Sequence, residues 1–161
     1  MLKAKGWIFF TGLIWFIIGF YLLSKGINLV VYSIQASHSP FLSFFSQFSR
    51  RQEESILMLV SLALLLGYIK GRFVLMKSVK RVVSRILSLT PPIKVKQVYT
   101  KGYFILLLSM MFLGLSVRFL PIASDVRGFI DLTIGAALMN GALLYFRFTL
   151  AYKKIEKSDQ R

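Results

Sequence analysis

The polar residues within the apolar segments of this 161-residue chain are the ones whose types and spacing could do chemistry. Lys70 and Arg72 stand near the end of an apolar segment, and Lys77 follows four apolar residues later. Asn140 and Arg147 occupy the corresponding stretch of the last apolar segment. Cationic groups combined with an amide bind phosphate and other anions through charge-assisted hydrogen bonds. The five residues therefore form a candidate site for a phospholipid headgroup or an anionic solute.

A structural interpretation competes with this anion site. Long Lys and Arg side chains near the end of a membrane helix can extend along the apolar surface to the headgroups. An Asn inside a membrane bundle commonly donates a hydrogen bond to a neighbouring helix. Under this interpretation Asn140 joins two helices and the basic residues contact the lipid surface, without a cavity between them.

Catalysis and metal binding have little support in the sequence. The chain has no cysteine, which excludes disulfides, thiolate metal sites and Cys nucleophiles. His38 is the only histidine, and the six carboxylates are scattered. Nothing resembles the strained turn that exposes a catalytic serine. We expect no catalytic residue, no metal site and no cofactor, and hence a protein that is not an enzyme.

Four apolar segments must position the polar residues. The chain is 56% hydrophobic, its mean hydropathy is +0.66, and only 17% of its residues are charged. About 20 helical residues cross the hydrocarbon core of a bilayer, and four segments have this length: 7–32, 55–76, 102–120 and 129–152. The sequence predicts an all-α membrane protein, a single domain over 1–161 with four transmembrane helices.

The net charge of +15 is distributed as a topology signal. No acidic residue occurs between Glu54 and Asp125. Lys and Arg close to span ends mark the cytoplasmic side, and they gather at Lys3 and Lys5, in the connection 77–101, and at Lys153, Lys154 and Lys157. We expect both termini and the connection 77–101 in the cytoplasm of a cell with an inner membrane. Anionic lipid headgroups are the expected partners, and nucleic acid is not, because no recognised binding pattern accompanies the charge.

The two halves of the chain resemble each other. Residues 5–7 and 101–103 both have the pattern Lys-Gly-aromatic. In each second span a glycine is followed six positions later by a basic residue, Gly71 by Lys77 and Gly141 by Arg147. These matches predict two parallel two-helix repeats related by a rotation about the membrane normal. Chance is the alternative, since apolar helices draw on few residue types.

Small residues indicate how the spans pack. Gly67 and Gly71 lie on one face of the second span, and Gly141 lies on the corresponding face of the fourth. Glycine lets two helix backbones approach closely. We expect the second and fourth spans to meet through these faces.

Three further expectations concern the segments between spans. Phe41, Phe44, Phe45 and Phe48 recur at helical spacing, which predicts a short helix in the outer membrane–water interface or a lid on the bundle. A second amphipathic helix is expected to continue the second span along the cytoplasmic surface, with Val79, Val82, Val83, Ile86 and Leu87 on one face and Lys80, Arg81 and Arg85 on the other. Such a basic helix contacts headgroups or docks a protein. Asp131 is expected to pair with Arg118 or Arg127.

The sequence favours a non-enzymatic protein with a structural or accessory role, which associates with anionic lipid or a larger membrane complex and self-associates. The alternative is a small transporter or channel for an anionic solute or lipid, completed by dimerisation. A water-accessible cavity that reaches Lys70 and Asn140 would favour the alternative.

Overall fold

The computed structural model describes residues 4–35, 39–88, 112, 119 and 121–159 of the chain. Its regular elements are helices: α1 (Ala4–Tyr32), the 3₁₀ turn η1 (Ser33–Gln35), α2 (Pro40–Ser46), α3 (Gln52–Lys70), the π-helical turn η2 (Gly71–Leu75), α4 (Met76–Ser88) and α7 (Ser124–Asp159). Among these residues three stretches are long and apolar enough to cross a membrane: Gly6–Tyr32, Glu53–Phe73 and Ser124–Ala151. The expectation of an all-α structure is confirmed for the described residues, with three helices that could cross a membrane. The expected span 102–120 lies almost entirely outside the described residues, and so does the part of the predicted duplication that depends on it.

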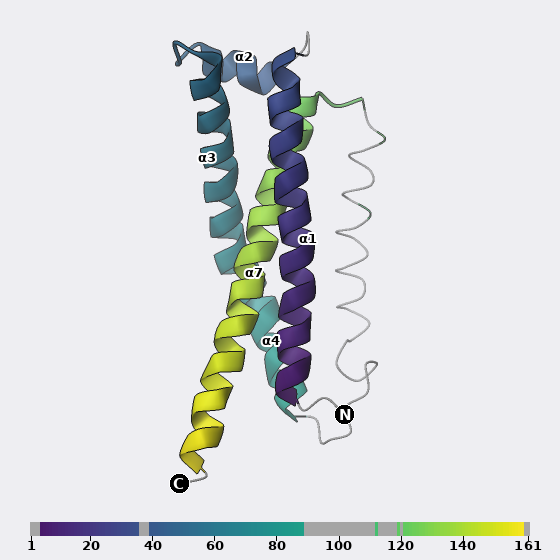
Figure 1. Ribbon diagram of the computed structural model, residues 1–161, viewed down its shortest axis with the longest axis vertical. Coiled ribbons are helices and arrows are strands. Elements are labelled where there is room, and N and C mark those ends of the chain that lie inside the picture. Colours follow the sequence, from purple (N-terminus) through teal and green to yellow (C-terminus); the bar gives the residue numbers. More distant parts are fainter. Residues whose placement is uncertain (1–3, 36–38, 89–111, 113–118, 120, 160–161) are drawn as a thin grey trace.

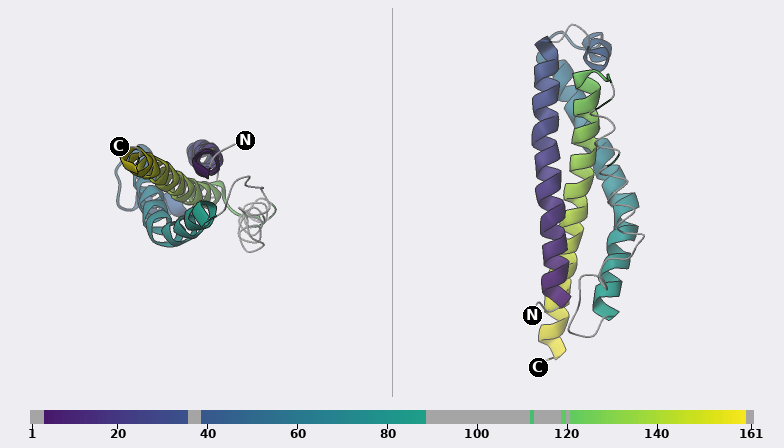
Figure 2. Two further views of the ribbon diagram at one scale, coloured as in Figure 1. Left: turned by 90° about the horizontal axis from the view of Figure 1, so that it is seen from below. Right: turned by 90° about the vertical axis from the view of Figure 1, so that its right-hand side faces the viewer.

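The long helices run side by side in a bundle (Figures 1 and 2). α1 begins at the end of the bundle where α4 and α7 finish, and α7 begins at the other end, beneath α2 (Figure 1). α1 is therefore antiparallel to α3 and to α7. We call the two ends the N-terminal end and the α2 end of the bundle.

The α1–α7 interface is built from small residues. Glycine recurs every seven residues in both helices, with alanine at one position: Gly12, Gly19 and Gly26 in α1, and Gly128, Gly135 and Ala142 in α7. A Cβ atom added to Gly19 would lie 3.0 Å from the carbonyl oxygen of Gly135, and one added to Gly135 would lie 2.8 Å from that of Gly19. Gly26 and Gly128 oppose each other in the same way, at 2.9 Å. Backbone meets backbone here, and only glycine permits this approach.

The helix that starts as α3 changes direction at η2 and continues as α4. A π-helical turn contains an extra residue and is a recognised cause of helix bending. The bend keeps α4 within the bundle, where Val79, Val82, Val83 and Ile86 are buried in a cluster that also contains Ile8, Trp15 and Tyr145. α1 and α7 cover this apolar face, whereas Lys80, Arg81 and Arg85 on the opposite face are exposed. Contact of this basic helix with headgroups stays a prediction. Leu87, which the periodicity placed on the apolar face, is exposed.

The short helix α2 lies across the end of the bundle (Figure 1). Phe41 and Phe45 pack against the buried cluster of Val30, Leu59, Ala63 and Leu132, whereas Phe44 and Phe48 are exposed. The backbone N–H groups of Phe41 and Leu42 donate to Oδ2 of Asp125, at 2.7 and 3.2 Å. The fully buried Asp125 carboxylate thus satisfies the first turn of α2 and fixes it to the start of α7.

Candidate functional site

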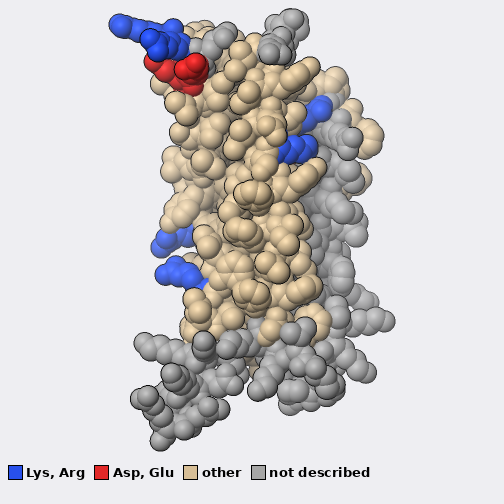
Figure 3. Space-filling model, in the orientation of Figure 1, with Lys and Arg blue, Asp and Glu red and all other residues tan. Residues whose placement is uncertain are grey.

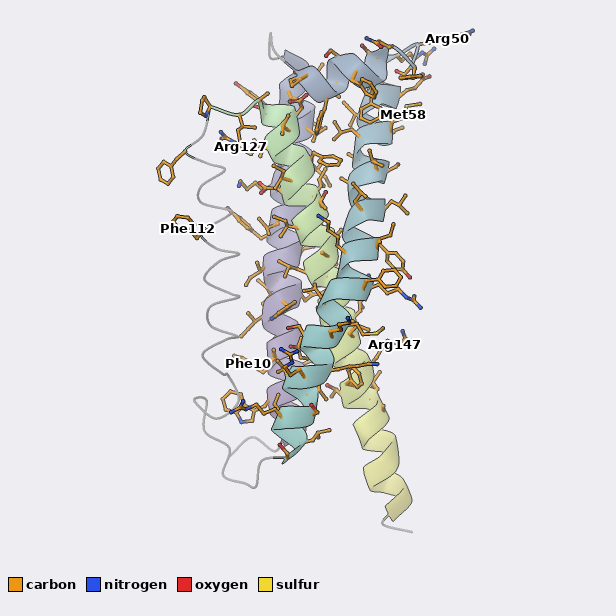
Figure 4. All side chains as sticks on the ribbon, turned by 180° about the vertical axis from the view of Figure 1, so that it is seen from behind. Phe10, Arg50, Met58, Phe112, Arg127 and Arg147 are labelled. Atoms are coloured by element: carbon orange, nitrogen blue, oxygen red, sulfur yellow. The ribbon has the colours of Figure 1, made fainter. Side chains whose placement is uncertain are left out.

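The basic residues of the predicted anion site are exposed on the outside of the bundle. Lys70 is the last residue of α3, Arg72 lies in η2 and Lys77 in the first turn of α4, and each is exposed. Basic side chains stand on the outer surface beside the end of α3, with uncharged residues above and below them (Figure 3). Arg147 is exposed on the outer surface of α7 (Figure 4). The basic groups therefore face the surroundings of the bundle rather than a shared interior.

Asn140 makes a contact between helices. Its Nδ2 donates to the backbone carbonyl oxygen of Tyr68 at 3.1 Å. This carbonyl also accepts from the backbone N–H of Gly71, at the point where α3 passes into η2. A π-helical turn disturbs the regular backbone ladder, so Asn140 supports α3 where its own hydrogen bonding is irregular. The Tyr68 side chain lies on the exposed side, where its hydroxyl accepts a hydrogen bond of 2.9 Å from Nη1 of Arg72.

The packing glycines named from the sequence occupy two different contacts. A Cβ added to Gly67 would lie 2.5 Å from the carbonyl oxygen of Thr133, and one added to Gly71 would lie 3.0 Å from Cβ of Asn140. α3 and η2 therefore press directly on α7 beside Asn140, with no room for a water molecule at these two positions. Gly141 lies instead against side chains: a Cβ added there would lie 3.0 Å from the Trp15 ring and 3.2 Å from Cδ1 of Leu75.

An ion pair joins α1 to α7 near the α2 end. Nζ of Lys25 lies 2.8 Å from Oδ2 of Asp131. We expected Asp131 to pair with Arg118 or Arg127. Arg118 lies outside the described residues, and the salt bridge runs to Lys25 of the neighbouring helix.

Lys25 is a residue that the sequence reasoning missed. It is the only charged residue between 7 and 32, and an ionisable group inside a membrane span is a candidate functional residue by default. That signal was sufficient to select it. Its partner was harder to predict from the sequence, because the prediction depends on the seven-residue glycine pattern that sets the pairing of α1 with α7.

The described His, Asp and Glu side chains do not gather in groups of three or more that could hold a metal ion. Comparison of the chain with protein-family models, with curated proteins and with solved structures finds no match.

Proposed function

We propose that this chain is a non-enzymatic, multi-pass protein of a bacterial-type inner membrane, with a structural or accessory role. In this role it associates with anionic lipid or with a larger membrane complex. The observation that carries the proposal is the contact of Gly67 and Gly71 with α7, which is tight where a transport pathway would need space. Asn140, the polar group nearest this contact, is already bonded to a backbone carbonyl.

The exposed basic residues support the lipid association. Lys70 and Arg72 stand near the end of the apolar stretch Glu53–Phe73, with their side chains on the exposed surface. Long basic side chains extend along an apolar surface toward the headgroups, and the Tyr68 hydroxyl accepts a hydrogen bond from Arg72 on this surface. Each basic group near an anionic membrane surface adds about 1 kcal/mol of attraction.

Four spans, with both termini in the cytoplasm, form part of the proposal. α4 ends at the N-terminal end of the bundle and α7 begins at the α2 end (Figure 1), so a connection that crosses once more, through 102–120, accounts for both positions. A reporter fused at Lys94 or after Arg161 should give a cytoplasmic signal, and one inserted at Ser37 an external signal. Opposite signals from Lys94 and Arg161 would exclude four spans.

The lipid association can be tested by native mass spectrometry of the protein purified in mild detergent, with retained lipids and proteins identified by mass. We expect phosphatidylglycerol or cardiolipin to copurify with the wild type. Lys70→Gln/Arg72→Gln should retain about one anionic lipid per chain fewer than the wild type, because it removes two charge-assisted contacts.

The matched control is Arg50→Gln/Arg51→Gln, which removes the same charge from exposed residues at the α2 end of the bundle. Equal loss in both variants would show a general charge effect and reject the site. Anion flux into liposomes that Asn140→Leu abolishes would instead favour a small transporter or channel.

A further inference from the structure

A groove of about 510 Å³ runs beside the last three turns of α1, and its described lining residues are Tyr21, Ser24, Lys25, Asn28, Leu29 and Tyr32. Every one of these side chains except that of Leu29 carries a hydrogen-bonding group. Polar residues are rare on the exposed side of a membrane helix and are retained there when they contact something polar. The size of the groove is within the range of small-molecule sites, about 300–1,000 Å³.

The Lys25–Asp131 ion pair places its positive group in the groove and its negative group outside it. The Lys25 side chain is 39% exposed and lines the groove, whereas that of Asp131 is 7% exposed and lies behind it. Nζ of Lys25 lies 2.8 Å from Oδ2 of Asp131, so the ammonium makes one charge-assisted contact with this carboxylate. An ammonium group has three N–H donors, and Lys25 therefore retains donors that can point into the groove.

The depth of Lys25 matches the position of a lipid phosphate. The apolar stretch Gly6–Tyr32 has 27 residues and is about 40 Å long, against about 30 Å of hydrocarbon. Lys25 lies seven residues before Tyr32, about 10 Å from the end of the stretch and about 5 Å below the hydrocarbon surface if the stretch is centred. A Lys stem spans this distance, so its ammonium reaches the level of the headgroups.

We propose that this groove binds the phosphate of a phospholipid headgroup from the leaflet at the α2 end. Lys25 contacts the phosphate oxygens, Asp131 holds the Lys25 side chain in place, and Ser24 and Asn28 donate hydrogen bonds to the headgroup. The proposal rests on residues other than Lys70 and Arg72, so either site can fail without the other.

The test is a titration of the full chain in mild detergent, followed by native mass spectrometry, with phosphatidylglycerol as the ligand and diacylglycerol as the phosphate-free comparison. Wild type should bind phosphatidylglycerol at least about tenfold more tightly than diacylglycerol. Asn28→Leu leaves the ion pair in place and should weaken phosphatidylglycerol binding about tenfold. Ile27→Leu is its matched control, because Ile27 is exposed, adjoins Asn28 in α1 and does not line the groove. This control variant should bind phosphatidylglycerol as the wild type does.

A second variant separates binding from stability. Lys25→Met alone leaves the buried Asp131 without its partner, so we pair it with Asp131→Leu, which removes both charges. The double variant should keep its melting temperature better than Lys25→Met and still lose phosphatidylglycerol binding. Each of these variants is also measured together with Lys70→Gln/Arg72→Gln, which lacks the other proposed lipid site and should by itself retain binding in the groove.

Three results would overturn the proposal. The first is unchanged phosphatidylglycerol affinity in both Asn28→Leu and the double variant. The second is equal or tighter binding of inorganic phosphate, which would identify a free anion as the ligand rather than a lipid. The third is a dimer in the wild type that Asn28→Leu dissociates, which would show that a second copy of the chain occupies the groove.

Discussion

α7 packs against α1 and against α3 through two contacts that are built differently. Toward α1 both helices present glycine, so that the backbone of Gly19 lies on that of Gly135 and the backbone of Gly26 on that of Gly128. Toward α3 only one helix presents glycine: Gly67 lies against a carbonyl oxygen and a methyl group of α7, because Thr133 and Ala136 stand opposite. The α3 contact also contains the hydrogen bond of Asn140, and the α1 contact contains the Lys25–Asp131 ion pair.

The difference between the contacts concerns freedom of movement. Glycine on both sides, repeated every seven residues, sets the register of α1 on α7 along most of its length. The contact of α3 is close at one crossing, since the two helices diverge toward the α2 end (Figure 1). Beyond the crossing the helix bends at η2, where Asn140 bonds to it. Nearer the α2 end α3 packs through side chains, with Leu59 and Ala63 against Leu132. We therefore expect α3 to pivot about the crossing more readily than α1, which cannot move without losing several contacts between backbones.

The first prediction compares a bulky residue in each contact. Gly135→Leu should destabilise the protein most, because its side chain meets backbone atoms of Gly19 and Leu23 within 3 Å and separates α1 from α7. Overpacking of this kind costs about 3 kcal/mol or more, which lowers the melting temperature by about 6–12 °C. Gly67→Leu should cost about half as much, since α3 can pivot away. The measurement is thermal unfolding in detergent, followed by circular dichroism and by the fluorescence of the buried Trp15.

Matched controls for these two variants lie on the exposed faces of the same helices. Leu143→Ile in α7 and Leu65→Ile in α3 change exposed side chains and should leave the melting temperature within about 2 °C, as exposed substitutions usually do. A loss of stability for Gly67→Leu equal to or larger than that for Gly135→Leu would mean that α3 is held as rigidly as α1, and the proposed difference between the contacts would be wrong.

The sequence was sufficient to predict a helical structure and the approximate positions of α1, α3 and α7. Apolar length alone located α1, α3 and α7, because each must cover about 30 Å of hydrocarbon. The bend at η2 was not predictable in the same way. Residues 71–75 read as ordinary helix, and whether a helix inserts an extra residue there depends on what α7 presents to it.

The candidate site was predictable as residue types and not as geometry. Lys70, Arg72 and Arg147 were selected because charges in apolar segments are conspicuous, but their exposure depends on how each helix is rotated in the bundle. The partner of Asp131 shows the same limit. Lys25 and Asp131 are more than 100 positions apart in the chain, and only the pairing of Gly26 with Gly128 brings them together.

The smallest expected effect concerns the hydrogen bond of Asn140. Asn140→Leu removes the side-chain donor to the Tyr68 carbonyl, which still accepts from the N–H of Gly71. Hydrogen bonds between membrane helices contribute about 0.6 kcal/mol on average and up to about 1.7. For the average value the melting temperature should therefore fall by about 1–2 °C, below the loss of about 3–6 °C expected for Gly67→Leu.

Asn140→Asp sharpens this prediction, because it keeps the size of the side chain and replaces the donor with an acceptor that faces the Tyr68 carbonyl. It should cost more than Asn140→Leu, since two acceptors then oppose each other across the contact between α3 and α7. If Asn140→Leu is instead as damaging as Gly67→Leu, the hydrogen bond and not the glycine packing determines the position of α3. The contact between α3 and α7 would then depend mainly on the hydrogen bond at the π-helical turn. Only the contact between α1 and α7 would depend on the close approach of backbones.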